Sequence, residues 1–300
     1  SSAQKWKYSP HGQHIELGIA ENNFFLLLGS LGISENLFGT RLLPVGTIYD
    51  TFIGRGLDAL NYATYIDARF ILVGTPSGVS LSHEGGAHQS IITPNIGMSQ
   101  PNLIYYEPSY ADEIDYLFFW ALNNIQNKHG KSVYFRLSTK KLTQPNRTVS
   151  NSLKNGLVRG GYWFKGQYEN VDILFICTGV IVGEVLKTIN ALRDDNLKIG
   201  LFIVSSPDIL YQDWMASTKK SNHVSFLETQ LSYIGPNVPI VTIIDGHSSS
   251  LSWIGSVSGQ KVIPLGVNNF GQSGDLNEVY QLSEIDLNSI VDRLAKFILQ

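Results

Sequence analysis

The chain has 300 residues, of which 43% are hydrophobic and 16% are charged, and its formal net charge is −3. A chain of this length forms about two domains of roughly 100–200 residues each. The near balance of 22 basic and 25 acidic residues offers no basic face for nucleic acid. The single cysteine, Cys177, excludes an internal disulfide framework and a multi-cysteine zinc site.

No segment has the length and composition of a membrane span. The most apolar stretch, residues 24–33, is about half as long as a helix that crosses a bilayer. Residues 1–14 are polar and contain no hydrophobic region of the signal-peptide kind. We therefore expect a protein of the cytosol or of an organelle matrix, without a membrane partner.

Segments of helical and strand character alternate from residue 15 to residue 137. Three segments have the apolar spacing of a helix: residues 15–31, 51–66 and 110–127. Four short apolar runs predict strands that are covered on both faces: residues 42–49, 70–74, 103–106 and 133–137. A loop rich in Gly, Ser and His, residues 75–90, follows the second of these strands. This order of elements predicts an α/β fold.

A polar stretch, residues 139–155, is the best candidate for a linker. Beyond it, residues 181–192 and 287–299 have helical character, and four runs predict strands: residues 172–177, 199–204, 224–227 and 240–244. We therefore expect an α/β chain of two consecutive domains with mainly parallel sheets, residues 1–148 and 149–300. The first domain opens on a helix, so we expect that its first strand–helix unit is missing and that the chain is a fragment or one half of a split protein.

Two groups of residues could carry chemistry. Glu21 directly precedes an apolar run, and a carboxylate in such a place is either partly buried, which raises its pKa, or a solvent-facing residue at a helix start. His83, Glu84 and His88 lie in the loop after the second predicted strand, where α/β sheets bind ligands. The alternative is that this loop is only a hydrophilic surface segment.

Two other segments have simpler interpretations. Residues 177–183 follow a strand and open a helix but lack the full GxGxxG pattern, so they predict a tight turn rather than a dinucleotide site. Cys177 ends an apolar strand and is expected to be a buried, inert thiol. His247 has no accompanying nucleophile elbow, so we interpret it as part of a loop or helix cap.

Three stretches together resemble the thiamine-diphosphate enzymes of the transketolase superfamily. Residues 12–22 are similar to their pyrimidine-binding domain with its GIxE motif, which here ends at Glu21. Residues 48–53 resemble the segment whose aromatic ring packs on the aminopyrimidine of the cofactor. Residues 82–89 match the family's loop with an acidic residue, glycines and a histidine.

The resemblance extends over residues 12–298, and some stretches resemble one branch of the superfamily more specifically. Four stretches resemble the large, homodimeric type of pyruvate dehydrogenase E1: residues 101–113, 132–139, 238–241 and 269–275. Residues 49–55, in contrast, are more similar to deoxyxylulose-phosphate synthase. The resemblance implies a pyrimidine-binding domain followed by a transketolase C-terminal-like domain, in which Asp245, His247 and Asp275 are structural.

The resemblance also implies roles for individual residues. Glu21 would hydrogen-bond N1′ of the aminopyrimidine and favour the imino tautomer that removes the thiazolium C2 proton. Phe52 would stack on the pyrimidine, with Tyr49 as a second wall. His88 would hydrogen-bond or protonate the substrate adduct.

Three further loop residues are candidates for contacts with substrate. They are His83, Glu84 and Arg55. Of these, His83 departs from the family, because related loops often have glycine or another small residue before the acidic position.

The implied activity is that of a 2-oxo-acid dehydrogenase E1, an oxidoreductase component that decarboxylates pyruvate and passes the acyl unit to a lipoyl group of an E2 partner. The alternatives are a transketolase or 1-deoxyxylulose-5-phosphate synthase acting on sugar phosphates, or a non-catalytic scaffold remnant. A phosphate-bearing acceptor needs several Arg or Lys near His88. Only Arg55 and Arg69 lie near in sequence, which favours E1.

The family holds the cofactor's diphosphate and its Mg²⁺ in a separate domain with a GDG…N motif, and this sequence contains no such motif. The resemblance therefore implies thiamine diphosphate and Mg²⁺ as cofactors, with no metal ligand in this chain. It implies a diphosphate-binding domain or subunit as a partner, in a dimer or heterotetramer.

Overall fold

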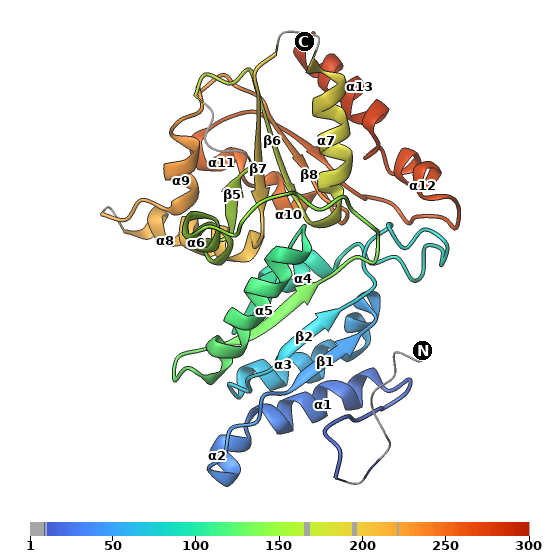
Figure 1. Ribbon diagram of the computed structural model, residues 1–300, viewed down its shortest axis with the longest axis vertical. Helices are drawn as coiled ribbons and strands as arrows, with labels where there is room; N and C mark the ends of the chain where they lie inside the picture. Colours follow the sequence, from blue (N-terminus) through green and yellow to red (C-terminus); the bar gives the residue numbers. More distant parts are fainter. Residues whose placement is uncertain (1–8, 10, 165–168, 194–196, 221, 300) are drawn as a thin grey trace.

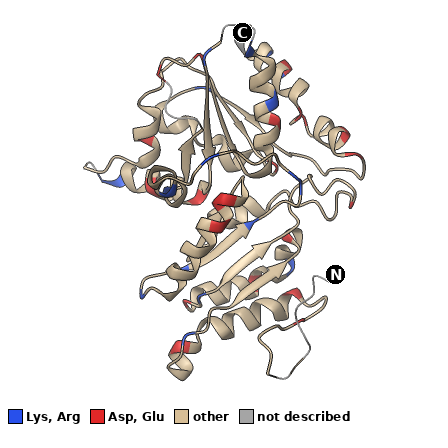
Figure 2. Cartoon of the chain, in the orientation of Figure 1, with Lys and Arg blue, Asp and Glu red and all other residues tan. Residues whose placement is uncertain are grey.

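The computed structural model describes residues 9, 11–164, 169–193, 197–220 and 222–299. Two α/β units with mainly parallel sheets lie one above the other along the long axis of the molecule (Figure 1). This confirms the predicted fold class. Figure 2 shows Lys and Arg spread over both units and interspersed with Asp and Glu. Among the described residues, no helix is long and apolar enough to span a bilayer.

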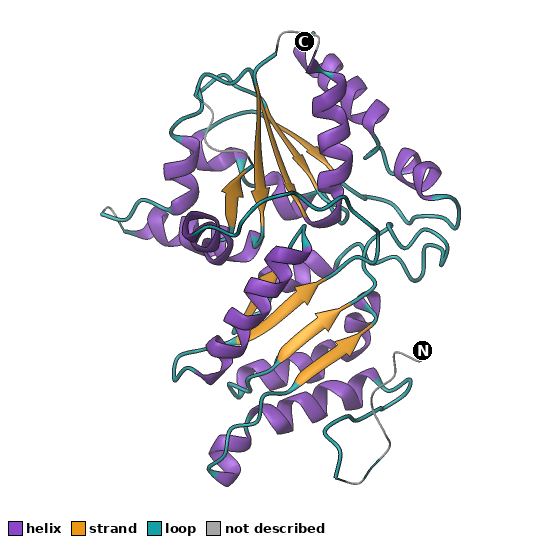
Figure 3. Ribbon diagram, in the orientation of Figure 1, coloured by secondary structure: helices purple, strands orange, loops and turns teal. Residues whose placement is uncertain are grey.

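The first unit contains a four-stranded parallel sheet with the strand order β1-β2-β4-β3. Its strands are β1 (Val45–Ile48), β2 (Ile71–Gly74), β3 (Leu103–Tyr106) and β4 (Ser132–Arg136). Its helices are α1 (Glu21–Gly32), α2 (Ser34–Phe38), η1 (Asp50–Gly56), α3 (Leu57–Tyr65), α4 (Thr93–Ser99) and α5 (Ala111–Gln126). Helices cover both faces of this sheet, as Figure 3 shows.

Strands β2, β3 and β4 are covered on both faces, whereas the edge strand β1 exposes Val45 and Thr47 on one face, so the strand expected there is only half covered. Neighbouring residues of a strand point to opposite sides. In β4, Val133 and Phe135 pack in one cluster with Leu117 of α5. Tyr134, between them, packs in another cluster with Phe25 of α1. Strands that are covered in this way have continuous apolar sequences, which is why the short apolar runs predicted them.

The second unit contains a five-stranded sheet with the order β5-β7-β6-β8-β9, in which only β5 is antiparallel to its neighbour. Its strands are β5 (Gly161–Trp163), β6 (Ile173–Thr178), β7 (Ile199–Val204), β8 (Ile240–Ile243) and β9 (Val262–Leu265). Its helices are α6 (Asn151–Arg159), η2 (Gly179–Ile181), α7 (Val182–Ala191), α8 (Pro207–Lys219), α9 (Phe226–Leu231), α10 (Ser249–Ser252), α11 (Gly255–Ser258), α12 (Leu276–Leu282) and α13 (Leu287–Ile298).

Three predicted elements are wrong in part or in whole. The helix expected over residues 51–66 is a 3-10 helix, η1, up to Gly56 and an α-helix, α3, only from Leu57 to Tyr65. The helix expected over residues 15–31 begins only at Glu21, and Gly18 before it has φ +64°, a left-handed conformation that interrupts a helix. The strand expected over residues 224–227 is absent, because α9 begins there. Ser225 Oγ accepts from the Glu228 N–H while the Glu228 side chain accepts from the Ser225 N–H, which is a capping box.

The two units share one hydrophobic core. Tyr106 and Tyr110 of the first unit belong to the same buried cluster as Tyr162 and Ile173 of the second. The carboxyl ends of β1–β4 point toward the second unit (Figure 1). Polar contacts cross at this edge, for example from the Glu107 N–H to the Ser205 carbonyl at 2.8 Å. Residues at the ends of these strands are therefore held against the second unit.

Candidate active site

Three rings that the sequence analysis assigned to cofactor and substrate lie together at the carboxyl end of β1. Tyr49 follows that strand, Phe52 lies in η1 and His88 lies in the loop after β2. The Tyr49 and Phe52 rings are stacked with centroids 5.5 Å apart. The His88 ring is edge-on, 5.5 Å from Phe52 and 6.2 Å from Tyr49. The fold thus joins segments about 36 residues apart into one aromatic cluster, at the sheet edge where α/β proteins bind ligands.

Glu21 lies at the same place through a contact with Arg55. Arg55 Nη1 donates to Glu21 Oε1 at 2.8 Å, and the guanidinium carbon is 3.8 Å from the centroid of the Phe52 ring. The Glu21 side chain is only 14% exposed, whereas that of Arg55 is 52% exposed. The guanidinium therefore covers the Phe52 face and neutralises the mostly buried carboxylate.

A glycine brings Glu21 to this position. A Cβ on Gly56 would lie 2.4 Å from the Phe25 ring and 3.1 Å from the Glu21 carbonyl oxygen. Only a residue without a side chain lets η1 approach the first turn of α1 so closely. The close approach of these two helices places Glu21 beside Arg55 and Phe52.

The remaining loop candidates lie at the rim. Glu84 lies beside the Tyr49 hydroxyl. The pKa of Tyr49 is raised first by burial and second by the Glu84 carboxylate. His83 is exposed, and its backbone carbonyl accepts from Ser273 Oγ at 3.0 Å. Glu84 is thus near the aromatic cluster, and the contact of His83 with the second unit is made by its backbone.

Arg69 lies at the opposite edge of the sheet. It precedes β2, and its guanidinium donates to the carbonyls of Asn127 and Lys128, the second at 2.8 Å. These residues follow α5 and come before the amino end of β4. Arg69 is therefore removed from the candidate site, whereas Arg55 lies on the Phe52 ring within it.

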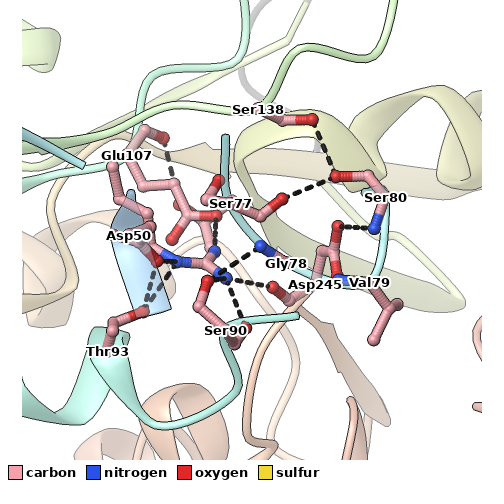
Figure 4. A network of polar contacts seen from close by, with 12 residues as sticks. Asp50, Ser77, Gly78, Val79, Ser80, Ser90, Thr93, Glu107, Ser138 and Asp245 are labelled. Atoms are coloured by element: carbon pink, nitrogen blue, oxygen red, sulfur yellow. Dashed lines mark hydrogen bonds and ion pairs between the residues drawn. The ribbon is translucent and has the colours of Figure 1, made fainter. Parts of the chain in front are cut away.

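A buried ionic cluster lies next to the site in the fold. Its residues were not predicted from the sequence. We call the following residues the Arg136 cluster: Arg136, Asp50, Glu107, Ser90 and Thr93 (Figure 4). Arg136 donates through Nε to Asp50 Oδ2 at 3.1 Å and through Nη1 to Glu107 Oε1 at 2.7 Å. Each of these charged residues ends or directly follows an apolar strand segment, and that was the signal in the sequence.

Because the charged groups of the Arg136 cluster are buried, each one shifts the pKa of its neighbours. Burial raises the pKa of Glu107, and Arg136 opposes this effect. Burial alone would lower the pKa of Arg136, but Glu107 and Asp50 raise it well above its usual value. The hydroxyl of Tyr105 donates to Glu107 and that of Tyr134 donates to Asp50. Arg136 is therefore held as a permanent buried cation.

Two of the three residues expected to be structural, Asp245 and His247, make side-chain contacts outside the site, whereas Asp275 precedes α12 and its side chain forms no capping hydrogen bond. The Asp245 carboxylate accepts from the N–H groups of Val79 and Ser80 at 2.8 and 3.1 Å. His247 Nδ1 is 2.8 Å from Ser249 Oγ at the start of α10, in agreement with a loop or helix cap. Cys177 is buried, and burial raises the pKa of its thiol. The predicted burial of this thiol is confirmed.

In the part of the chain that the structure describes, no group of three or more His, Cys, Asp or Glu side chains could hold a metal ion. The side chains at the carboxyl edge are those of Glu21, the half-exposed Arg55 and the aromatic cluster with the His88 imidazole, with Glu84 at the rim. The fold and this site define a two-domain α/β chain whose ligand-binding edge faces its second domain.

Comparison with known proteins shows what the chain is similar to. Residues 160–286 match the transketolase-like TK C-terminal domain. Transketolase 2 of Saccharomyces cerevisiae is 27% identical over 290 residues, which are 96% of this chain and 38% of that protein. The pyruvate dehydrogenase E1 component of Pseudomonas aeruginosa is 22% identical over 294 residues, 93% of this chain and 33% of that protein. The second domain thus matches the transketolase C-terminal family, and nearly the whole chain is similar in sequence to transketolases and to a pyruvate dehydrogenase E1 component.

Solved structures share the fold. Transketolase from Campylobacter jejuni superposes with a TM-score of 0.74 at 17% identity, over 94% of this chain and 39% of that one. A structure titled as a split-gene transketolase in an inactive β4 tetramer superposes with a TM-score of 0.68 at 17% identity, over 93% of this chain and 82% of that one.

The comparisons favour the transketolase alternative over the expected E1 activity. The relative named for pyruvate dehydrogenase E1 is less similar in sequence than the yeast transketolase. The expected E1 activity is therefore supported less well than its transketolase alternative. The chain spans 38% of the length of the yeast transketolase that it matches.

Proposed function

We propose that this chain provides the pyrimidine-binding and C-terminal parts of a thiamine-diphosphate-dependent transketolase. The observation that carries the proposal is the convergence of Glu21, Phe52 and His88 at the carboxyl edge of the first sheet. Relatives named as transketolases across nearly the whole chain support the same assignment.

The residues at this edge fit an aminopyrimidine ring. The Phe52 face already carries a flat, nitrogen-bearing group, the Arg55 guanidinium, at 3.8 Å. The same group donates a hydrogen bond to Glu21 at 2.8 Å. A pyrimidine ring combines a flat π surface with a ring nitrogen in the same way, so Phe52 and Glu21 would hold it and Arg55 would give up its place. Bound thiamine diphosphate would supply a thiazolium ring that takes up the electron pair left on the former carbonyl carbon of the substrate when its carbon–carbon bond breaks.

Each residue of this chain then has a defined task. Glu21 holds a proton at Oε1 for a ring nitrogen, in a largely buried position where a charge-assisted hydrogen bond is strong. Tyr49 and Phe52 orient the ring by stacking. His88 extends the aromatic cluster on the loop side and can hold or donate a proton at an imidazole nitrogen.

We place the diphosphate and Mg²⁺ outside this chain, on a further segment or a separate subunit. The structure titled as a split-gene transketolase supports this arrangement, because this chain covers 82% of that one. In that protein, a chain of this extent exists as a subunit. A dimer or heterotetramer that brings the two parts together is part of the proposal.

A 2-oxo-acid dehydrogenase E1 is the second candidate. The relative from Pseudomonas aeruginosa and the similarity of residues 101–113 and 269–275 to E1 favour it. Of Arg55 and Arg69, only Arg55 lies at the site, on the Phe52 ring, and a single half-exposed arginine also fits an acceptor without phosphate. The two candidates differ in the acceptor, which is an aldose phosphate or a lipoyl group.

The deciding experiment uses the assembled natural protein with thiamine diphosphate and Mg²⁺. We expect two-carbon transfer from a ketose phosphate to an aldose phosphate. Chromatography of the sugar phosphates measures this transfer. Glu21→Gln keeps the size of the side chain but cannot exchange a proton, so it should abolish transfer. Glu35→Gln, in the exposed pair of α2 with Arg41, is the matched control and should retain transfer.

Three results would redirect the assignment. Pyruvate-dependent reduction of an artificial electron acceptor, lost in Glu21→Gln, would move the protein to the E1 class. Transfer that persists in Glu21→Gln would refute the proposed role of this carboxylate. Binding of no cofactor and no turnover with either substrate class would leave the scaffold alternative.

A further inference from the structure

We propose that Arg136 is a positioning residue of the site. It holds η1, which carries Phe52, and the loop that carries His88 in one arrangement relative to each other and to the second domain. The inference deepens the proposed function and rests on it for the meaning of the site. The contacts of the Arg136 cluster carry the inference.

The first set of contacts fixes η1. Arg136 Nε donates to Asp50 Oδ2 at 3.1 Å, and Asp50 is the first residue of η1, two residues before Phe52. Thr93 Oγ1 donates to the same oxygen at 2.6 Å. The Tyr134 hydroxyl donates to the other carboxylate oxygen. Both oxygens of Asp50 are thus held, and with them the start of η1.

The second set of contacts fixes the loop. Arg136 Nη2 donates to the Ser90 carbonyl at 3.0 Å and to Ser90 Oγ at 3.2 Å. Ser90 lies two residues after His88. Ser90 Oγ also accepts from the Gly78 N–H at 2.9 Å, near the beginning of the same loop. One guanidinium therefore joins η1 to the loop and, through Ser90, draws the two ends of the loop together (Figure 4).

The third contact reaches the second domain. Arg136 Nη2 donates to the Asp245 carbonyl at 2.7 Å. The Asp245 carboxylate in turn accepts from the N–H groups of Val79 and Ser80 in the loop. A Cβ on Gly78 would lie 2.4 Å from this carboxylate, so the approach of the loop is close. The position of the loop is thus coupled to the domain interface.

Burial and geometry indicate positioning rather than stabilisation. Arg136 is 1% exposed, and its Nη1 pairs with Glu107 at 2.7 Å, so the charge is compensated. A buried ion pair adds little net stability compared with apolar residues. A planar guanidinium with five fixed donors, however, sets the directions and distances of several partners at once. Lysine would keep the charge but lose this geometry.

Arg136→Lys in the assembled natural protein tests the proposal, and Arg147→Lys is the matched control. Arg147 is also an arginine with several carboxylate contacts, to Asp112 at 2.7 and 2.9 Å and to Glu113 at 2.8 Å, but it contacts α5 and not the site. The first readout is amide hydrogen exchange, which does not depend on the proposed function.

We expect Arg136→Lys to speed exchange in residues 50–56 and 85–90 together by at least about tenfold, because charge-assisted hydrogen bonds hold both segments. Protection of β6 and β7 should stay unchanged. Arg147→Lys should leave residues 50–56 and 85–90 as they are in the unaltered protein.

The second readout is calorimetric titration with thiamine diphosphate in the presence of Mg²⁺. Arg136→Lys should raise the Kd by at least about tenfold, which corresponds to about 1.4 kcal/mol. Arg147→Lys should leave the Kd unchanged. If the unaltered assembly binds no thiamine diphosphate, the proposed function fails, and the exchange data alone decide whether Arg136 positions the two segments.

Two results would overturn the proposal. One is faster exchange spread evenly over the chain in Arg136→Lys, which would mean a general loss of stability. The other is unchanged exchange in both segments. If Arg136→Lys does not fold, Asp50→Asn replaces it, since this variant weakens only the first set of contacts. Asp50→Asn should then speed amide exchange in residues 50–56 and leave residues 85–90 protected. Faster exchange in residues 85–90 with unchanged exchange in residues 50–56 would refute the proposal.

Discussion

The guanidinium carbon of Arg55 lies 3.8 Å from the centroid of the Phe52 ring, and Arg55 Nη1 donates to Glu21 Oε1 at 2.8 Å. A cation on an aromatic face and an ion pair with a partly buried carboxylate therefore involve the same arginine. Any flat ring that stacks on Phe52 and hydrogen-bonds Glu21 has to compete with it. In the proposed function, the affinity for the cofactor would depend in part on this competition.

Arg55→Ala should strengthen binding of thiamine diphosphate to the assembled protein. The cation–π contact and the half-exposed ion pair are each worth about 0.5–1 kcal/mol, so removal of both, about 1–2 kcal/mol, should lower the Kd by about five- to thirtyfold. Calorimetric titration measures this change. Arg159→Ala, which removes a similar contact with Phe226 at 4.2 Å in the second domain, should leave the Kd unchanged. A Kd that rises in Arg55→Ala would show that Arg55 instead helps to hold the cofactor.

Phe52→Leu should weaken the same binding, because leucine fills the space but offers no π face. Aromatic stacking contributes about 0.5–1.5 kcal/mol beyond burial, which corresponds to a Kd raised by about two- to tenfold. Phe119→Leu on α5 is the control, since that ring is 68% exposed and lies on a helix away from the site. Equal affinity of Phe52→Leu and the unaltered protein would contradict stacking on Phe52.

Gly56→Ala should destabilise the first domain. The added Cβ would lie 2.4 Å from the Phe25 ring, and overpacking of this kind costs about 1–3 kcal/mol. Urea unfolding of the chain measures the loss. Gly54→Ala in the same helix has nothing within 4 Å of its added Cβ and should change the free energy of unfolding by less than about 0.5 kcal/mol. Equal effects of the two substitutions would refute the close approach of η1 and α1.

Asp208 should make stability depend on pH. It is buried near the start of α8 and accepts from the Tyr105 N–H, and burial raises its pKa to about 7. The folded chain keeps a proton that the unfolded chain, with a pKa of about 3.9, has already lost. The free energy of unfolding should therefore fall as the pH rises from about 4 to about 7, by up to about 1.4 kcal/mol per pH unit.

Asp208→Asn removes this titration. The free energy of unfolding of the variant, minus that of the unaltered chain, should therefore increase from about pH 5 to about pH 8. Urea unfolding of both proteins at the two pH values measures the difference. A difference that is the same at both pH values would rule out Asp208 as the titrating group.

Local sequence patterns predicted much of the fold. The apolar runs at β2, β3 and β6 identify strands because these strands are covered on both faces, and α5 follows from the spacing of Leu117, Ala121 and Ile125. The strand expected over residues 224–227 failed because the capping box of Ser225 and Glu228 outweighs the apolar run. The site residues Glu21, Phe52 and His88 were selected from their motifs, and their catalytic roles remain predictions.

The sequence by itself determined the two-domain α/β order and the segments that carry Glu21, Phe52 and His88, because both depend on patterns within a few neighbouring residues. Only the tertiary structure decided which charges meet. Arg136 contacts Asp50, 86 residues away, and the Asp245 carbonyl, 109 residues away, because parallel strands bring their carboxyl ends to one edge and the second domain closes over it. The same structure removed Arg69 from the site, because that residue precedes its strand and so lies at the opposite edge. Strand direction and domain packing are long-range properties, and no local pattern encodes them.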